Sequence, residues 1–468
     1  MKKFKDQVDL IIILLIGVFL RGRIITRDDF WFDEAFTGLL TKVPKAAFLE
    51  ILSQDTHPPL YSALCRGWAL LFGTGDLSIR SLSLVFGVAT IIAVYLLARR
   101  LFGKDVATLS ALLVALNPFL TSYSVEARSY AFYGLLVVLA TYFLVNKKTV
   151  LFTIVAILGI FTHFVFFAYL GVLLGYYLYL ILRKELKLSR QIPNLVLIAA
   201  AFAASLYMAA PRQDYLNIDW VQKADLTNIS QSLAAYTFGV GVKSAGSHGV
   251  NDLRLFINSK SMGVIIFSFL TIGMTVLIQR FKKDQKVVTN NLLCIFLVLI
   301  PQLTLIAYGL VTGNNIYIER YLLPSAIFYL VILANIFTNL FRFETTAMII
   351  LIFMLTLARV QKPTYYEGMK MVAAGFERTG EKIAFTSPID FVVAKYYLYE
   401  NRQNIRLYDP QDPGNDYSWW PFIEKEDHLK DTQGVLFISP DAKRMGSEFR
   451  QLEENLEFKD YQVYVATQ

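Results

Sequence analysis

Two adjacent carboxylic acids, Asp33 and Glu34, follow the first long apolar segment of the chain. A carboxylate can take the proton from a hydroxyl or amine as that group attacks another molecule, which is the work of a general base. An acid pair at the end of an apolar segment is more often a solvated loop than a catalytic site. The chemical interpretation therefore depends on which other polar residues reach the same place.

Three further ionisable residues, Glu126, Arg128 and Arg320, also stand at the ends of apolar segments. Arginine has forked N–H donors that match the oxygens of a phosphate group, and ionisable groups near membrane depth usually face a cavity or pair with each other. Acids beside such arginines would suit a phosphate-bearing lipid substrate. Two structural alternatives remain open: an ion pair between Glu126 and Arg128 that joins two spans, and a headgroup anchor at Arg320.

The composition is that of a polytopic membrane protein. Of the 468 residues, 55% are hydrophobic and only 18% are charged, which excludes an ordinary soluble globular protein. The formal net charge of +8 comes from short Lys and Arg runs between apolar segments, as in cytoplasmic loops, and not from a nucleic-acid surface. Cys65 and Cys294 lie in apolar surroundings and fit neither a disulfide framework nor a metal site.

The basic residues predict the side of the membrane on which each loop lies. Lys2, Lys3 and Lys5 precede the first apolar segment, so the first span starts in the cytoplasm. Asp33 and Glu34 are then expected outside. The basic start and the lack of a small-residue cleavage site favour a retained first span over a removed signal peptide.

Residues 57–72 are expected to lie along the outer membrane surface as an amphipathic or half-embedded helix. The segment opens with His57 and two prolines and carries Arg66. If it crossed the membrane, the basic run of Arg99, Arg100 and Lys104 would lie outside, against the positive-inside rule. A helix on the surface places that run inside.

A span needs about 20 apolar residues, and about eleven spans are predicted. If the chain crosses the membrane this many times, the basic runs between the spans all lie on the cytoplasmic side. Lys104 and Lys283 are then cytoplasmic, whereas Glu126, His248 and the C-terminal segment are extracytoplasmic. The predicted spans are residues 10–25, 79–98, 106–120, 130–145, 150–161, 164–182, 195–209, 262–278, 292–310, 321–340 and 346–360.

Two domains are predicted, a transmembrane domain over residues 1–360 and a soluble extracytoplasmic α/β domain over residues 361–468. Short buried strands are expected at residues 383–385, 405–408, 435–438 and 461–466, with helices at residues 391–400 and 446–456. The polar stretch 211–260 is too long for a simple turn. It is interpreted either as a mobile lid or as a static interfacial helix.

Five short segments resemble, in order, the motifs of one enzyme superfamily. This set resembles the GT-C glycosyltransferases related to protein O-mannosyltransferases and lipid A aminoarabinose transferases, over roughly residues 10–340. The resemblance implies a GT-C fold and an inverting transfer of a monosaccharide from a polyprenyl-phosphate carrier to a lipid, glycan or protein acceptor on the extracytoplasmic face of the cell membrane. The segments are Phe32-Asp33-Glu34-Ala35, His57-Pro58-Pro59-Leu60-Tyr61, Tyr123 to Tyr130, Thr162-His163-Phe164 and Arg320-Tyr321-Leu322-Leu323-Pro324.

The resemblance also implies roles for residues that match the motifs. Asp33 corresponds to the catalytic base, and Glu34 and Glu126 are further catalytic candidates. The candidates for binding the donor phosphate or the substrate are His57, Arg128, Tyr130, His163, Arg320 and Tyr321. The implied partners are the lipid-linked donor, the acceptor and membrane lipids, and no nucleic acid.

The residue types fit this chemistry. A lipid phosphate leaves readily once its charge is held by arginine, and the acceptor then needs one base on the opposite face of the sugar. No nucleotide is needed. Carboxylate oxygens would accept a divalent metal ion as a cofactor, but no ligand cluster demands one. The alternative is a transporter or flippase of lipid-linked sugars, which would hold the same phosphate. The chain shows no internal repeat of the kind that many transporters have.

Overall fold

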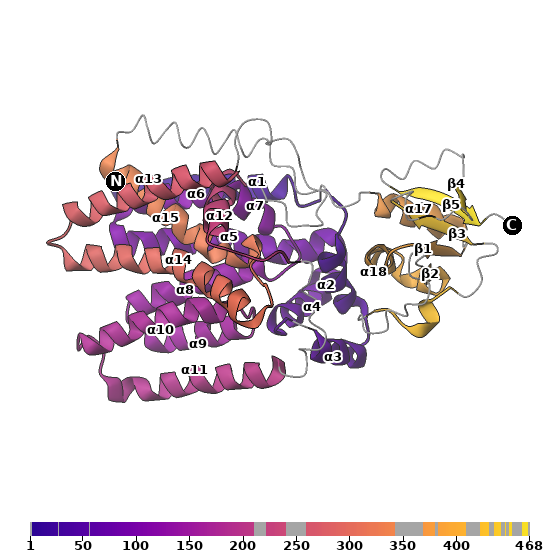
Figure 1. Cartoon of the computed structure of the whole chain (residues 1–468), viewed down its shortest axis with the longest axis horizontal. Helices are drawn as coiled ribbons and strands as arrows, with labels where there is room; N and C mark the ends of the chain where they lie inside the picture. The colour runs from indigo at the N-terminus through magenta and orange to yellow at the C-terminus, as the bar shows by residue number, and fades with distance from the viewer. Residues whose placement is uncertain are drawn as a thin grey trace. The chain divides into compact units, whose positions relative to one another are not determined.

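The computed structural model describes residues 2–26, 28–55, 57–209, 221–239, 259–341, 368–379, 382–408, 422–429, 435–440, 445, 449–451 and 461–466. The chain forms two compact units (Figure 1). The first, here called the bundle unit, comprises Met1–Ile25, Thr56–Tyr61 and Arg80–Pro363, and the second, called the sheet unit, comprises Thr26–Asp55, Ser62–Ile79 and Thr364–Gln468. Both units are therefore assembled from segments far apart in the sequence.

The bundle unit consists of apolar helices around α15, whose residues are nearly all buried. The helices α6 and α14 pack against α15, and α8 packs against α9. Each predicted span overlaps one or two helices, except residues 346–360, which lie outside the described residues. Residues 106–120 are divided between α6 and α7 at Asn117. The helices are α1 (Lys2–Gly22), α5 (Asp76–Phe102), α6 (Lys104–Leu116), α7 (Pro118–Tyr123), α8 (Tyr130–Val145), α9 (Thr149–Ile160), α10 (Phe166–Leu182), α11 (Leu188–Ala209), α12 (Thr227–Phe238), α13 (Ser259–Arg280), α14 (Gln285–Thr312), η2 (Glu319–Leu322) and α15 (Leu323–Leu340).

Within the described residues, five helical stretches are long and apolar enough to cross a membrane. Several others are apolar but shorter, among them α8, α9 and α10. A helix rises 1.5 Å per residue, so a helix of about 12 residues covers only about 18 Å of a hydrocarbon core of about 30 Å. The chain is thus a membrane protein, and the count of about eleven spans stays a prediction. The five stretches are Asp76–Phe102, Leu188–Ala209, Gly263–Arg280, Gln285–Thr312 and Glu319–Leu340.

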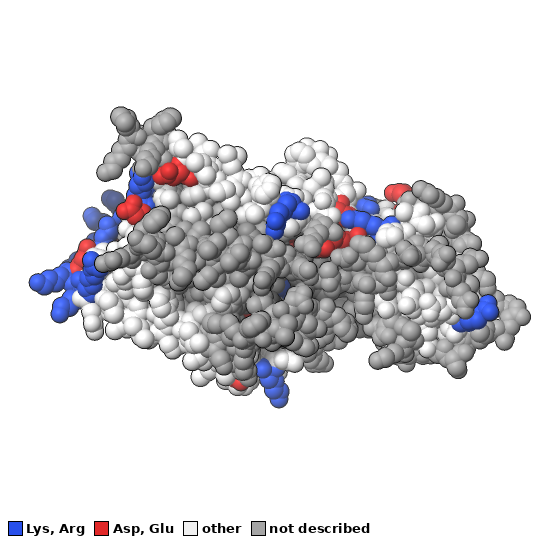
Figure 2. All heavy atoms as spheres, turned by 90° about the horizontal axis from the view of Figure 1, so that it is seen from above, with Lys and Arg blue, Asp and Glu red and all other residues white. Residues whose placement is uncertain are grey.

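The basic loops lie together at one end of the bundle unit. Arg100 Nε donates to Asn146 Oδ1 across 2.9 Å, which joins the loop after α5 to the loop after α8. Lys147 pairs with Glu185 at 2.9 Å, which adds the loop after α10. Lys and Arg side chains gather at this end, on the left of Figure 2. The alternation that the sequence predicts for these loops is therefore present in the fold.

The middle of the predicted lid, α12, is a helix packed against α13 and α7. Tyr236 is fully buried, and its carbonyl accepts a hydrogen bond of 2.6 Å from Asn117 Nδ2. For these residues the packing fits the static-helix alternative. Most of the remaining stretch, residues 211–220 and 240–258, lies outside the described residues.

The sheet unit contains a five-stranded sheet in the order β2-β1-β3-β5-β4. β1 is parallel to β2 and to β3, and β5 is antiparallel to β3 and β4. The helix α18 connects β1 to β2 and packs against both. The strands are β1 (Ile383–Phe385), β2 (Ile405–Leu407), β3 (Leu436–Ser439), β4 (Phe449–Gln451) and β5 (Gln462–Ala466), and the helices and 3₁₀ turns of this unit are α2 (Phe32–Lys42), α3 (Lys45–Gln54), α4 (Leu60–Phe72), α17 (Met369–Thr379), α18 (Pro388–Tyr397), η3 (Tyr399–Asn404) and η4 (Lys425–Asp427).

Four of these strands lie where the sequence predicts them, but the helix predicted at residues 446–456 is wrong where the chain is described. Phe449–Gln451 form the edge strand β4, paired with β5. The ring of Phe449 lies 4.7 Å from that of Phe437 in the core of the sheet. Pairing and packing with distant residues thus override a short local pattern.

The segment after α1 belongs to the same compact unit as the C-terminal segment. An apolar cluster forms along α2, α3 and the turn between them, with Tyr399 and Phe422 among its neighbours; its buried residues are Leu40, Val43, Phe48 and Leu52. The acid-bearing helix α2 also packs along α18. The predicted domain boundary at residue 360 separates α2 from α18, whereas in the structure both helices belong to one compact unit.

Candidate active site

Six of the residues singled out in the sequence meet at the other end of the bundle helices, away from the basic loops. They come from the segments that begin α4, α8 and α15 and from the turn between α9 and α10. Tyr130 is 1% exposed and His163 is 3% exposed, whereas the remaining side chains are buried or half-buried. The six residues are His57, Arg128, Tyr130, His163, Arg320 and Tyr321.

Two hydrogen bonds orient the arginines of this cluster. Arg128 donates from Nη2 to Nε2 of His57 across 3.1 Å, so that nitrogen of His57 carries the lone pair. Arg320 donates from Nε to the hydroxyl of Tyr130 across 3.0 Å. These two hydrogen bonds place both guanidinium groups at this end of the bundle unit.

His163 lies among the aromatic rings of the cluster. Its ring stacks on Tyr133 with centroids 4.8 Å apart and meets Tyr321 edge-on at 5.0 Å. Its Nδ1 accepts a hydrogen bond of 3.2 Å from the backbone N–H of Val165, which places the ring proton of a neutral imidazole on Nε2. Among the described residues the buried Nε2 has no hydrogen-bond partner. It is therefore a donor available to a ligand.

The pKa of His163 lies well below its usual value. Burial disfavours the charged imidazolium, and the nearby basic side chains of His57, Arg128 and Arg320 lower the pKa further. The side chain is accordingly neutral near pH 7. The same positive surroundings would favour an anionic ligand.

Hydrogen bonds from backbone and hydroxyl groups connect the motif segments to one another. The N–H of Leu60 donates to the carbonyl of Phe161 across 3.0 Å. The hydroxyl of Ser83 lies 2.7 Å from that of Tyr61 and 3.3 Å from the carbonyl of Arg128. The position of Arg128 is thus tied to the start of α4, and α4 to the turn that carries His163.

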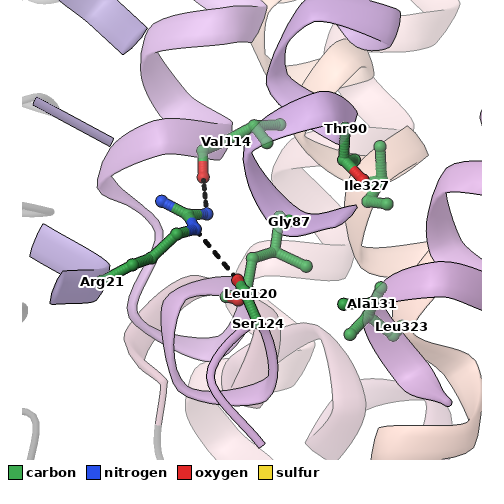
Figure 3. Close-up of a pocket in the computed structure, with 9 residues that line it drawn as sticks. All are labelled: Arg21, Gly87, Thr90, Val114, Leu120, Ser124, Ala131, Leu323 and Ile327. Carbon is green, nitrogen blue, oxygen red and sulfur yellow. Dashed lines mark hydrogen bonds between the residues drawn. The ribbon is translucent and has the colours of Figure 1, made fainter. Parts of the chain in front are cut away.

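Arg21 is a supporting residue that the sequence analysis does not single out. It is 1% exposed and donates to the carbonyls of Val114 and Ala115, at the end of α6, and to Ser124 Oγ at 3.0 Å (Figure 3). Cationic donors at a helix C-terminus satisfy its last carbonyls and favour its dipole. Arg21 therefore anchors the loop that leads to Glu126 and Arg128.

A small cavity of about 10 Å³ lies beside Arg21 (Figure 3). Its lining includes the polar side chains of Thr90 and Ser124. This volume suffices for about one water. A side chain at Gly87 would collide with Ser124, so glycine is required where α5 approaches this loop.

The three predicted acids occupy different places. Glu126 is 4% exposed and lies between α7 and α8, two residues before Arg128. Asp33 and Glu34 belong to the sheet unit and lie in the first turn of α2. Asp33 is half-buried, whereas Glu34 is completely buried. No described group of three or more His, Cys, Asp or Glu side chains is arranged to hold a metal ion.

Residues 56–208 match the family described as dolichyl-phosphate-mannose-protein mannosyltransferase. No curated protein sequence matches the chain. Among solved structures, ArnT from Cupriavidus metallidurans in the apo state is 11% identical with a TM-score of 0.64, over 100% of this chain and 98% of that chain. The same protein bound to undecaprenyl phosphate is 12% identical with a TM-score of 0.60, over 97% of each chain.

The oligosaccharyltransferase of Archaeoglobus fulgidus in the apo form is 13% identical with a TM-score of 0.54, over 94% of this chain and 70% of that chain. These solved structures share the GT-C fold, and the chain is therefore a membrane protein with that fold. The resemblance to GT-C glycosyltransferases predicted from the five motifs is confirmed.

Proposed function

We propose that the chain is an inverting glycosyltransferase that moves a monosaccharide from a polyprenyl-phosphate carrier to a lipid, glycan or protein acceptor on the extracytoplasmic face. The observation that carries this proposal is the meeting of Arg128, Arg320 and His163 at one end of the bundle unit. The basic loops gather at the other end, and the positive-inside rule assigns that end to the cytoplasm.

In this proposal the cluster binds the donor phosphate. The guanidinium groups of Arg128 and Arg320 supply charge-assisted donors, and His57 and Tyr130 orient them. His163 adds a neutral N–H donor from Nε2. As the bond between the anomeric carbon and the phosphate oxygen breaks, negative charge grows on the phosphate, and preorganised donors lower the energy of that state.

Asp33 is the proposed base that takes the proton of the acceptor hydroxyl or amine. Its half-buried side chain is reachable by an acceptor, whereas Glu34 is completely buried. Attack from the face opposite the phosphate inverts the anomeric carbon, as in inverting glycoside chemistry. Glu126 is proposed to orient Arg128 or the acceptor, because its buried side chain lies two positions before Arg128 in the sequence.

The proposal is tested by incubating the purified protein with undecaprenyl-phosphate-linked pentoses and hexoses and a mixed acceptor extract. Mass spectrometry should detect released undecaprenyl phosphate together with a product that gains one sugar, and NMR should show an inverted anomeric configuration. Movement of a lipid-linked sugar across a vesicle membrane without release of the sugar would contradict a transferase and favour the transporter alternative.

A further inference from the structure

The chain that enters the acid-bearing helix α2 is fixed by the C-terminal segment of the sheet unit. Asp29 Oδ2 accepts hydrogen bonds from the backbone N–H groups of Gly368 and Lys370, at 3.0 and 3.2 Å. These N–H groups open α17, and a carboxylate at a helix N-terminus is favourable. The side chain of Lys370 lies 3.6 Å from Asp29 and 2.7 Å from Asp76.

The next residue is fixed by a relay through a tyrosine. The backbone N–H of Phe30 donates to the hydroxyl of Tyr397 across 2.7 Å, and that hydroxyl donates to Asp76 across 2.8 Å. Tyr396 donates to the same carboxylate across 2.9 Å, and its ring stacks on Phe30 at 4.8 Å. Because linked hydrogen bonds polarise one another, the relay is stronger than its separate bonds.

The body and the far end of α2 are also held by α18 and by the first residue of η3. A Cβ atom at Gly38 would lie 2.5 Å from the ring of Tyr396, so only glycine permits this approach. Lys42, the last residue of α2, donates to the carbonyl of Tyr396 across 2.8 Å and lies 4.2 Å from the centre of its ring. The hydroxyl of Tyr399 donates to the carbonyl of Lys42 across 3.2 Å.

These contacts lie before, along and after the turn that carries Asp33 and Glu34. A helix of 11 residues is too short to be stable by itself in water, so its position depends on this packing. A general base must approach its proton to within about 3 Å, and a misplacement of about 1 Å can cost about 100-fold in rate.

We propose that the start of α17 and the stretch from α18 to Tyr399 form the positioning element of the acid-bearing helix, and that Tyr396 and Tyr397 set the place of Asp33 for transfer. The inference rests on the proposed function only for the role of Asp33. Tyr396 and Tyr397 are positioning residues, because they act on the reaction through α2.

The first experiment measures hydrogen exchange in the full-length protein. Gly38→Ala forces α2 away from Tyr396, and Tyr397→Phe keeps the ring but removes the hydroxyl that links Phe30 to Asp76. Amides of residues 29–42 should exchange about tenfold faster in both variants, whereas those of β1 and β3 should keep their rates. Unchanged exchange over residues 29–42 in both variants would overturn the proposal.

Two matched controls are available in the same unit. A Cβ atom at Gly67 in α4 would meet nothing within 4 Å, so Gly67→Ala adds the same methyl group harmlessly. Tyr408→Phe removes a hydroxyl that makes no hydrogen bond among the described residues. Both controls should keep the wild-type exchange rates.

The second experiment compares turnover with binding of undecaprenyl phosphate as the probe. Gly38→Ala and Tyr397→Phe should lower turnover by about 10- to 100-fold and leave the Kd for the probe within about twofold. Faster exchange with wild-type turnover would overturn the inference. A wild-type protein that is inactive with every donor would count against the proposed function instead, and the exchange rates would still decide whether the C-terminal segment holds α2.

Discussion

Arg128 donates a hydrogen bond of 3.1 Å to His57, a residue 71 positions earlier in the chain. The bond joins the end of the Tyr123 to Tyr130 motif to the His57-Pro58-Pro59 motif, and Ser83 and Tyr61 connect the same two segments through their hydroxyls. A guanidinium group carries charge-assisted donors that suit an anionic ligand. These two motifs thus belong to one physical cluster.

The first prediction concerns the base. Asp33→Asn keeps the size of the side chain but removes its ability to take a proton, so transfer should fall by roughly 100-fold or more. Binding of undecaprenyl phosphate should survive. Glu50→Gln, on the exposed face of α3 in the same unit, is the matched control and should keep wild-type turnover. Near-normal turnover of Asp33→Asn would remove Asp33 as the base and make Glu34 or Glu126 the next candidate.

The second prediction concerns the phosphate site. Arg320→Ala removes a charged donor that Tyr130 orients, and hydrogen bonds to charged groups contribute about 1.5–3 kcal/mol. The Kd for undecaprenyl phosphate should therefore rise about 10- to 100-fold, measured by calorimetry in detergent. Tyr130→Phe should weaken binding less, because it disturbs only the orientation of the guanidinium group. Equal affinity of Arg320→Ala and wild type would exclude Arg320 from the phosphate site.

The third prediction concerns pH. Because the pKa of His163 is lowered in the folded protein, the unfolded chain binds more protons than the folded chain below the ordinary histidine pKa of about 6.5. This group therefore lowers stability as the pH falls below about 6.5 and has no effect above it, with a limiting slope of about 1.4 kcal/mol per pH unit. His163→Gln does not titrate, so its unfolding midpoint should fall less than that of wild type from about pH 7 to about pH 5. Parallel pH curves for the two proteins would contradict this assignment.

The fourth prediction concerns orientation. Cysteines introduced beside Lys104 and Lys283 should react with an impermeant thiol reagent only from the cytoplasmic side, and a cysteine near Asp33 only from outside. The native Cys65 and Cys294 are buried and free, so they should contribute little background. Labelling beside Lys104 from outside would reverse the proposed orientation.

The bundle helices, and the side chains that stand at their ends, could be predicted from the sequence for a physical reason. Long apolar segments, charged runs and residues such as His57, Arg128 and Arg320 at segment ends are local signals. The contacts that hold α2 are not local: Phe30 meets Tyr397, and Lys42 meets Tyr396, across more than three hundred residues. No periodicity in either segment indicates its partner.

Arg21 illustrates the same limit within the bundle unit. An arginine close to the end of an apolar segment is also what a headgroup anchor looks like. Only the fold reveals that its side chain is buried against α6 and Ser124. The sequence offers only a weak signal for this role, namely a charged residue inside the last turn of the first apolar helix.

The last prediction follows from this burial. Arg21→Met keeps a long side chain but removes the donors to Val114, Ala115 and Ser124, and each buried acceptor left unsatisfied costs about 1–3 kcal/mol. The variant should lose at least about that much stability, measured as the unfolding midpoint in detergent. Arg100→Met, which removes an exposed bond to Asn146, is the control and should change stability by less than about 1 kcal/mol. If Arg21→Met were as stable as this control, Arg21 would not anchor the loop before Glu126 and Arg128.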